Sequence, residues 1–174
     1  MITAKDVIDL ITLAESQGIE VFLDGGWGVD ALLGEQTREH QDIDLFVRKE
    51  QAALYILLLQ NNGFSEYKEA FSTAQHIVFR DKEGRTIDLH LFEYAPDGRI
   101  LYEGEFYPAD TFSGKGRIAG KEVVCVPPAA QVAFHVGYVF DDNDIKDVLS
   151  LCRRFHIPIP PEYQPYVDGT SIPE

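Results

Sequence analysis

The sequence predicts an α+β (mixed α/β) fold class, with a small mixed β-sheet flanked by helices. Apolar residues recur at helical spacing near both ends of the chain, and short β-branched segments lie between them. Glycine, asparagine or proline separates most of these segments. With 174 residues, of which 45% are hydrophobic and 25% charged, the chain is expected to form a single domain with a buried core.

The first half of the chain is expected to alternate helices with strands. Thr3 and Asp6 have the spacing of a capping box, which predicts a helix that begins there and ends at Gly18. Further elements are expected in this order: a strand over 20–23, a helix over 27–33, a buried strand over 42–47, and a helix over 50–60 that is stopped by Asn61-Asn62-Gly63.

The second half is expected to contain two hairpins, two helices and a tail. The hairpins are expected over 75–92 and 117–126, with turns at 81–84 and 119–120. Pro127-Pro128 predicts the start of a helix that reaches about Tyr138, and a second helix is expected over 142–154, capped by Asp142 or Asn143. The chain therefore divides into an αβ core (1–126), a helical part (127–157) and a surface tail (158–174).

The net charge of the chain limits the classes of molecule that it is expected to bind. The chain has 15 Lys and Arg against 29 Asp and Glu, a net charge of −14, which opposes binding to nucleic acid or to an anionic membrane and favours a cationic small molecule. No apolar segment reaches the roughly 18 residues that span a bilayer, and the N-terminus lacks the pattern of a signal peptide. Cys125 and Cys152 are expected to be buried thiols. We expect a cytoplasmic protein.

Asp42 and Asp44 are the first candidate site residues. In a strand, residues i and i+2 point to the same face, about 7 Å apart. Ile43 and Leu45 would then point into the core. Two neighbouring carboxylates repel each other unless a cation lies between them, and paired divalent ions about 4 Å apart are suited to phosphoryl transfer. The alternative is an exposed strand face with two solvated acids.

Asp88 and His90 lie in a second apolar strand, with their side chains on one face. If this strand neighbours the Asp42–Val47 strand, Asp88 would lie about 5 Å from the acid pair. It would then complete a metal site or accept a proton from a substrate hydroxyl. His90 would contact the substrate or the acids, although an ordinary half-buried histidine has the same pattern.

Gly25 and Gly26 lie between a predicted strand and a predicted helix. Glycines at this place let a phosphate approach the backbone N–H groups of the helix N-terminus, although most such glycines only make the turn. Arg38 and His40, which lie between these glycines and the acid strand, are candidate phosphate contacts. A solvated loop arginine is the alternative.

Two segments, DGGWGVDAL at 24–32 and REHQDIDL at 38–45, resemble the signature of small antibiotic nucleotidyltransferases. These are the lincosamide nucleotidyltransferases and the aminoglycoside 2″-nucleotidyltransferases, which belong to the DNA polymerase beta-like superfamily. The resemblance extends from Val21 through the Asp88 strand to the segment Asp144-Ile145-Lys146-Asp147. It implies the polymerase beta-like nucleotidyltransferase fold.

The resemblance implies a role for each matching residue. Asp42, Asp44 and Asp88 would hold Mg²⁺, as two ions, with Asp88 as ligand or general base. Gly25, Gly26, Arg38, His40 and Lys146 would contact a nucleoside triphosphate, expected to be ATP. His135 and Tyr138, three positions apart on the predicted helix from Pro127, would line a substrate pocket together with His90, or would simply pack there.

The implied reaction is transfer of a nucleoside monophosphate to a hydroxyl of a small molecule, a lincosamide or an aminoglycoside, with release of pyrophosphate. A protein acceptor, another metabolite or a non-catalytic nucleotide-binding module are the alternatives, and a homodimer is also implied. Four aromatic residues would form an acceptor wall or would be ordinary packing: Tyr102, Phe106, Tyr107 and Phe112.

Overall fold

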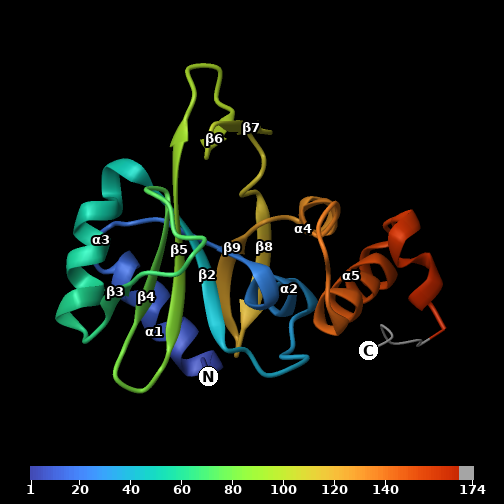
Figure 1. Ribbon diagram of the computed structural model, residues 1–174, viewed down its shortest axis with the longest axis horizontal. Coiled ribbons are helices and arrows are strands. Elements are labelled where there is room, and N and C mark those ends of the chain that lie inside the picture. Colours follow the sequence, from blue (N-terminus) through green and yellow to red (C-terminus); the bar gives the residue numbers. More distant parts are fainter. Residues whose placement is uncertain (169–174) are drawn as a thin grey trace.

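A nine-stranded mixed sheet forms the centre of the computed structural model, which describes residues 1–168 (Figure 1). The elements follow in this order: α1 (Ala4–Glu15), β1 (Val21–Asp24), α2 (Gly25–Leu33), β2 (Asp42–Arg48), α3 (Lys49–Asn61), β3 (Ser65–Tyr67), β4 (His76–Arg80), β5 (Thr86–Tyr94), β6 (Ile100–Tyr102), β7 (Glu105–Tyr107), β8 (Gly114–Ile118), β9 (Lys121–Cys125), α4 (Pro128–Phe134), α5 (Asp142–Phe155) and the 3₁₀ helix η1 (Pro161–Tyr166).

The strand order is β3-β4-β5-β2-β1-β9-β8, and the β6–β7 hairpin continues from the end of β5. β2 lies between β1, which is antiparallel to it, and β5, which is parallel. The predicted hairpins are β4–β5 and β8–β9. The predicted fold class, a mixed sheet flanked by helices, is confirmed.

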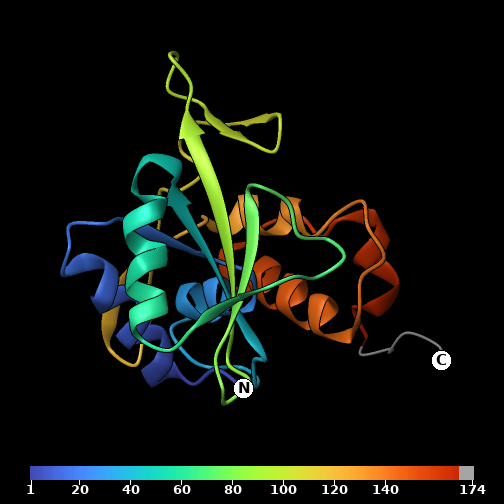
Figure 2. The same cartoon turned by 60° about the vertical axis from the view of Figure 1, so that its left-hand side comes forward.

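One face of the sheet is covered by α1 and α3 (Figure 2). The capping box of Thr3 and Asp6 begins α1 as predicted, with the Asp6 backbone N–H donating to the Thr3 hydroxyl and the Asp6 carboxylate accepting from the Thr3 N–H. Ile43 and Leu45 of β2 are fully buried beneath these helices, as the alternation predicted. Because successive strand residues alternate, the acids of β2 and β5 must lie on the other face.

The other face combines the acids with a cluster of aromatic side chains. Phe22, Phe46 and Phe92 belong to this cluster, and α4 packs against it through Phe134. The stacked rings of Phe22 and Phe112 are 4.5 Å apart between centroids. The face that carries the acids is therefore partly apolar.

The structure corrects three predicted elements. α4 ends at Phe134 rather than near Tyr138, since Gly137 adopts a left-handed conformation with φ +89°, which breaks the helix. Asp141, rather than Asp142 or Asn143, caps α5 by accepting from two backbone N–H groups. The segment after Tyr94, for which no strand was predicted, contains the short hairpin β6–β7.

The predicted surface tail contains the 3₁₀ helix η1, and one of its residues is buried. Tyr163 is fully buried, stacks on Phe140 with centroids 4.4 Å apart, and donates to the backbone carbonyl of His135. The rest of the predicted tail, 169–174, lies outside the described residues. Cys125 and Cys152 are buried free thiols, as predicted. Over residues 1–168, helices that combine the length and the hydrophobicity needed to cross a bilayer are absent.

Candidate active site

Three aspartates lie side by side on adjacent strands. Asp24 is the register partner of Asp44 across β1 and β2, and Asp44 is the register partner of Asp88 across β2 and β5. Side chains directly opposite one another on paired strands have Cβ atoms about 5 Å apart. Asp42 precedes Asp44 by two residues and shares its face. The predicted juxtaposition of the β2 acids with Asp88 is present.

This gathering of acids leaves negative charge unbalanced. Desolvation, followed by the carboxylates of Asp44 and Asp88, raises the pKa of Asp42 to about 6, although the residue keeps an exposed surface. Burial and the Asp44 carboxylate likewise raise the pKa of Asp24. Groups that resist ionisation because their neighbours are also anionic favour binding of a cation.

Two histidines contact the acids. His90 Nε2 lies 3.2 Å from an oxygen of Asp44, and His76 Nε2 lies 2.8 Å from an oxygen of Asp88. The two imidazole rings are 4.3 Å apart between centroids. The other ring nitrogen of His90 lies 2.9 Å from the Tyr102 hydroxyl, so both nitrogens of His90 are engaged.

The two glycines lie in the first turn of α2 and bring its backbone against the acids. Gly25 has φ +57°, and a Cβ there would collide with the Asp44 carboxylate. A Cβ on Gly26 would collide with Arg38 and would lie 2.6 Å from His40 Nδ1. The glycines therefore allow the N-terminus of α2, with its free N–H groups and partial positive charge, to approach the site.

Arg38 and His40 are both paired with acids. The Arg38 guanidinium donates to Asp147 of α5 at 2.8 Å and is partly exposed. His40 is only 2% exposed and bonds Asp30 through Nε2 at 2.5 Å. His40 thus packs beside Gly26 from inside the fold, whereas Arg38 links the loop before β2 to the C-terminal helices.

The remaining predicted residues lie around α4 and α5. Lys146 is exposed on α5. The His135 ring is bonded to the carbonyl of Gln131 at 2.7 Å, and the Tyr138 hydroxyl donates to Asp144 at 2.9 Å. His135 and Tyr138 do not share a helix face as predicted, because α4 ends before both of them. Their rings are nevertheless neighbours, with centroids 6.4 Å apart.

A cavity of about 310 Å³ adjoins the acids. Its lining includes Asp24 and His90 and is otherwise mainly apolar: Phe46, Ile100, Tyr102, Tyr107, Thr111, Phe112, Ala133, Phe134 and Val136. Tyr102, Tyr107 and Phe112 therefore line a pocket. This agrees with the interpretation of these aromatic residues as a pocket wall rather than as ordinary packing alone. Phe106 is half exposed beneath Arg99 and does not line it.

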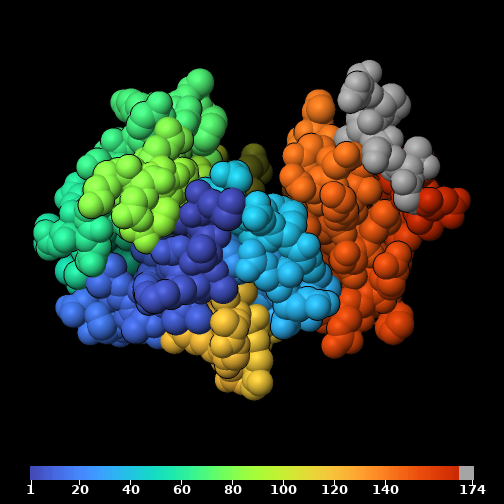
Figure 3. Space-filling model, turned by 90° about the horizontal axis from the view of Figure 1, so that it is seen from below, coloured from blue at the N-terminus to red at the C-terminus, as the bar shows by residue number. Residues whose placement is uncertain are grey.

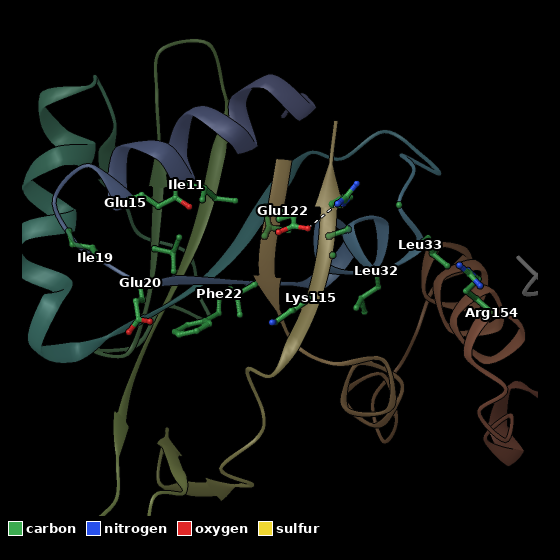
Figure 4. Close-up of a pocket in the computed structure, with 17 residues that line it drawn as sticks. Ile11, Glu15, Ile19, Glu20, Phe22, Leu32, Leu33, Lys115, Glu122 and Arg154 are labelled. Atoms are coloured by element: carbon green, nitrogen blue, oxygen red, sulfur yellow. Dashed lines mark hydrogen bonds and ion pairs between the residues drawn. The ribbon is translucent and has the colours of Figure 1, made fainter. Parts of the chain in front are cut away.

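A second cavity, of about 560 Å³, lies between α1, α2, β1, β8 and β9 and contains none of the predicted site residues (Figure 4). On the molecular surface, a hollow separates the green β3–β5 region from the orange α4–α5 region (Figure 3). The ion pair between Arg38 and Asp147 joins the loop before β2 to α5.

The acids suit a hard divalent cation by donor type and by charge, since Mg²⁺ prefers carboxylate oxygens. Within residues 1–168, however, groups of three or more His, Cys, Asp or Glu side chains already gathered tightly enough to hold a metal ion are absent. One oxygen of Asp44 contacts His90, and one oxygen of Asp88 contacts His76.

Comparison with known proteins identifies the fold and the enzyme class. The model of a protein family described as aminoglycoside-2″-adenylyltransferase matches residues 6–151. The chain belongs to this family. Its members are nucleotidyltransferases, so the predicted enzyme class, an antibiotic-type nucleotidyltransferase, is confirmed.

Individual relatives and solved structures extend this result. A lincosamide resistance protein of Staphylococcus haemolyticus is 27% identical over 154 residues, covering 86% of this chain and 94% of the relative. The lincomycin-bound crystal structure of the lincosamide adenylyltransferase LnuA is 28% identical, with a TM-score of 0.77 over 90% of this chain and 99% of LnuA. ANT(2″)-Ia in complex with adenylyl-2″-tobramycin is 20% identical, with a TM-score of 0.72 over 87% and 88% of the two chains, and shows the same fold.

Two residues that the structure places at the site were not predicted from the sequence. Asp24 was part of the matched segment, but it ends a strand whose pairing with β2 the sequence did not reveal. His76 begins β4, and only the β4–β5 register brings it opposite His90. For His76, the alternation of the hairpin around the 81–84 turn was the available signal.

We expect the crowding of the acids to lower stability as pH rises. The folded pKa of Asp42 exceeds its ordinary value of 3.8. The folded state therefore binds the proton more tightly, and its stability falls as pH rises from about 4 to 6 and stays reduced above that range. Asp42→Asn should remove this loss, which we place at about 1 kcal/mol because the residue is partly exposed.

Urea unfolding of both proteins at pH 4 and pH 7.5 measures this effect. The stability gained by Asp42→Asn should be larger at pH 7.5. Asp9→Asn, on the opposite side of the sheet in α1, is the matched control and should gain nothing. A gain that is equal at the two pH values for Asp42→Asn would contradict the prediction.

Proposed function

We propose that the chain transfers AMP from Mg²⁺-bound ATP to a hydroxyl of a lincosamide antibiotic and releases pyrophosphate. The observation that carries the proposal is the register of Asp44 and Asp88 on adjacent parallel strands, beside the N-terminus of α2 and an apolar cavity. The identity of 28% with lincomycin-bound LnuA, over almost the whole of both chains, supports the choice of acceptor.

Each group has a physical role in this proposal. The backbone N–H groups at Gly25 and Gly26 bind phosphate oxygens, and Arg38, with Lys146 of α5, neutralises the charge of the triphosphate. Asp42 and Asp44 would hold the two Mg²⁺ ions, which supply charge neutralisation for attack at the α-phosphorus, and Asp88 would act as the general base rather than as a ligand.

Proton transfer falls to Asp88 in this proposal. Both ring nitrogens of His90 are already engaged, by Asp44 and Tyr102. The Asp88 carboxylate has one oxygen bonded to His76, which leaves the other free to accept the proton of the acceptor hydroxyl. His90 then orients the Asp44 carboxylate and forms part of the cavity wall. His40, buried with Asp30, supports the glycine turn.

The test is an acceptor screen. The purified chain is incubated with Mg²⁺, each nucleoside triphosphate and a panel of lincosamides and aminoglycosides, and the products are analysed by mass spectrometry. Lincomycin should gain the mass of one AMP, and chelation of Mg²⁺ should abolish the gain. A label from ATP that appears on protein rather than on any antibiotic would overturn the proposal.

Two further expectations stay predictions. The homodimer implied by the resemblance is checked by sedimentation of the purified chain. A cytoplasmic location, where nucleoside triphosphates are abundant, is checked by cell fractionation.

A further inference from the structure

Asp24 has no role in the proposed reaction. It ends β1 immediately before the glycine pair and occupies the N-cap position of α2. N-cap aspartates usually accept hydrogen bonds from the second or third N–H of the helix. The Asp24 side chain makes no such bond. Its charge is therefore not used to cap α2.

The carboxylate instead borders the 310 Å³ cavity. Asp24 is the only acidic residue among the described residues that line it. The rest of the wall is dominated by aromatic and aliphatic side chains, several of which belong to the cluster around Phe46 and Phe112. A pocket of this kind binds an apolar body and fixes its orientation through one charged group.

Two histidines near Asp24 already have other hydrogen-bond partners. His90 and His135 are close enough to act on it electrostatically, but the ring of His90 is engaged by Asp44 and Tyr102, and that of His135 by the carbonyl of Gln131. On the other side, the Asp44 carboxylate is its register partner. A cation bound in the cavity would place a positive charge beside the Asp24 carboxylate.

We propose that Asp24 binds the protonated amine of the acceptor and is the specificity-determining residue of the pocket. The class of acceptor is then a molecule with one basic amine and an apolar substituent. This inference rests on the proposed function. A polycationic acceptor would bring more ammonium groups than the single carboxylate of the cavity could pair, and each unpaired charge would be costly to desolvate.

Asp24→Asn tests the inference, with KM and kcat measured separately for the acceptor and for Mg²⁺-ATP. The probes are lincomycin, which carries one basic amine, and an analogue in which an acyl group replaces the N-methyl group of that amine, so that the nitrogen is a neutral amide. In the wild type, lincomycin should have the lower KM. In Asp24→Asn, the KM for lincomycin should rise about 10- to 100-fold, because a partly buried charge pair is lost. The KM for Mg²⁺-ATP should stay within about twofold.

The variant should also treat the two acceptors nearly alike, which a purely structural role of Asp24 would not produce. Asp110→Asn is the matched control: it removes the same charge from an exposed residue just before Thr111 of the cavity wall, and should leave both KM values unchanged. An unchanged KM for lincomycin in Asp24→Asn, or a rise confined to Mg²⁺-ATP, would overturn the inference and would make Asp24 part of the metal site instead.

Comparison of the two acceptors with the wild-type enzyme tests the inference even if Asp24→Asn does not fold. Equal KM values for lincomycin and its acylated analogue would overturn the inference and leave the proposed function intact. Failure of the wild type to modify either acceptor would overturn the proposed function, and the inference with it.

Discussion

Replacing Asp44 with asparagine is expected to lower kcat/KM for nucleotidyl transfer about a thousandfold, since a carboxylate that supports transition-state charge contributes several kcal/mol. Asp44 is central to the site: it pairs in register with both Asp24 and Asp88 and contacts His90. The amide keeps the shape of the side chain but removes its charge. The measurement is steady-state formation of pyrophosphate with ATP and lincomycin.

The fold should survive this change, because like-charge repulsion among the acids is relieved. Thermal unfolding of the variant should therefore occur at the wild-type temperature or above it. Asp9→Asn, an equivalent change in α1 on the opposite side of the sheet, should keep full activity. Activity of Asp44→Asn within tenfold of the wild type would contradict the assignment of these acids to the reaction.

Gly25→Ala is expected to have the second-largest effect. Gly25 has φ +57°, and the added methyl group would collide with the Asp44 carboxylate. The strain of the left-handed backbone should cost about 1 kcal/mol of unfolding free energy. Displacement of Asp44 should lower kcat/KM about a hundredfold, since small misplacements of reacting groups have effects of that size. Chemical unfolding and steady-state kinetics measure the two effects separately.

Gly34→Ala is the control that separates the effect of backbone strain from the effect of displacing the Asp44 side chain. Gly34 also has a positive φ, +81°, at the C-cap of α2, but a Cβ there would meet no atom within 4 Å. This variant should lose similar stability and retain its activity. Equal losses of activity in the two alanine variants would mean that the contact of Gly25 with Asp44 is unimportant.

The elements that could be predicted from sequence are those whose signals are local. The capping box at Thr3, the turn at 81–84 and the acid-bearing strand over 42–47 each depend on residues close together in the chain. The helix from Pro127 was predicted too long, since its apolar spacing continues past the point where Gly137 turns the backbone. The β6–β7 hairpin was missed because its strands have only three residues each.

The residues of the candidate site also divide into those that a local pattern predicts and those that depend on strand pairing. Asp42 and Asp44 share a face by strand periodicity alone, so the sequence could pair them. The position of Asp88 depended on which strands are neighbours, and the resemblance to a known family supplied that information. Asp24 required the register of β1 with β2, which no local pattern encodes. His76 required the register of β4 with β5, for which only the alternation of the hairpin gave a signal.

The parallel pairing of β2 with β5 joins segments more than forty positions apart, from the partnership of Asp42 with Thr86 to that of Arg48 with Phe92. Hairpins such as β4–β5 can form early during folding, but this non-local contact closes a long loop and forms slowly. Because Asp44 and Asp88 meet only through this pairing, a chain in which it has not formed lacks the site. On refolding from denaturant, recovery of enzyme turnover should therefore lag behind the return of helical circular dichroism.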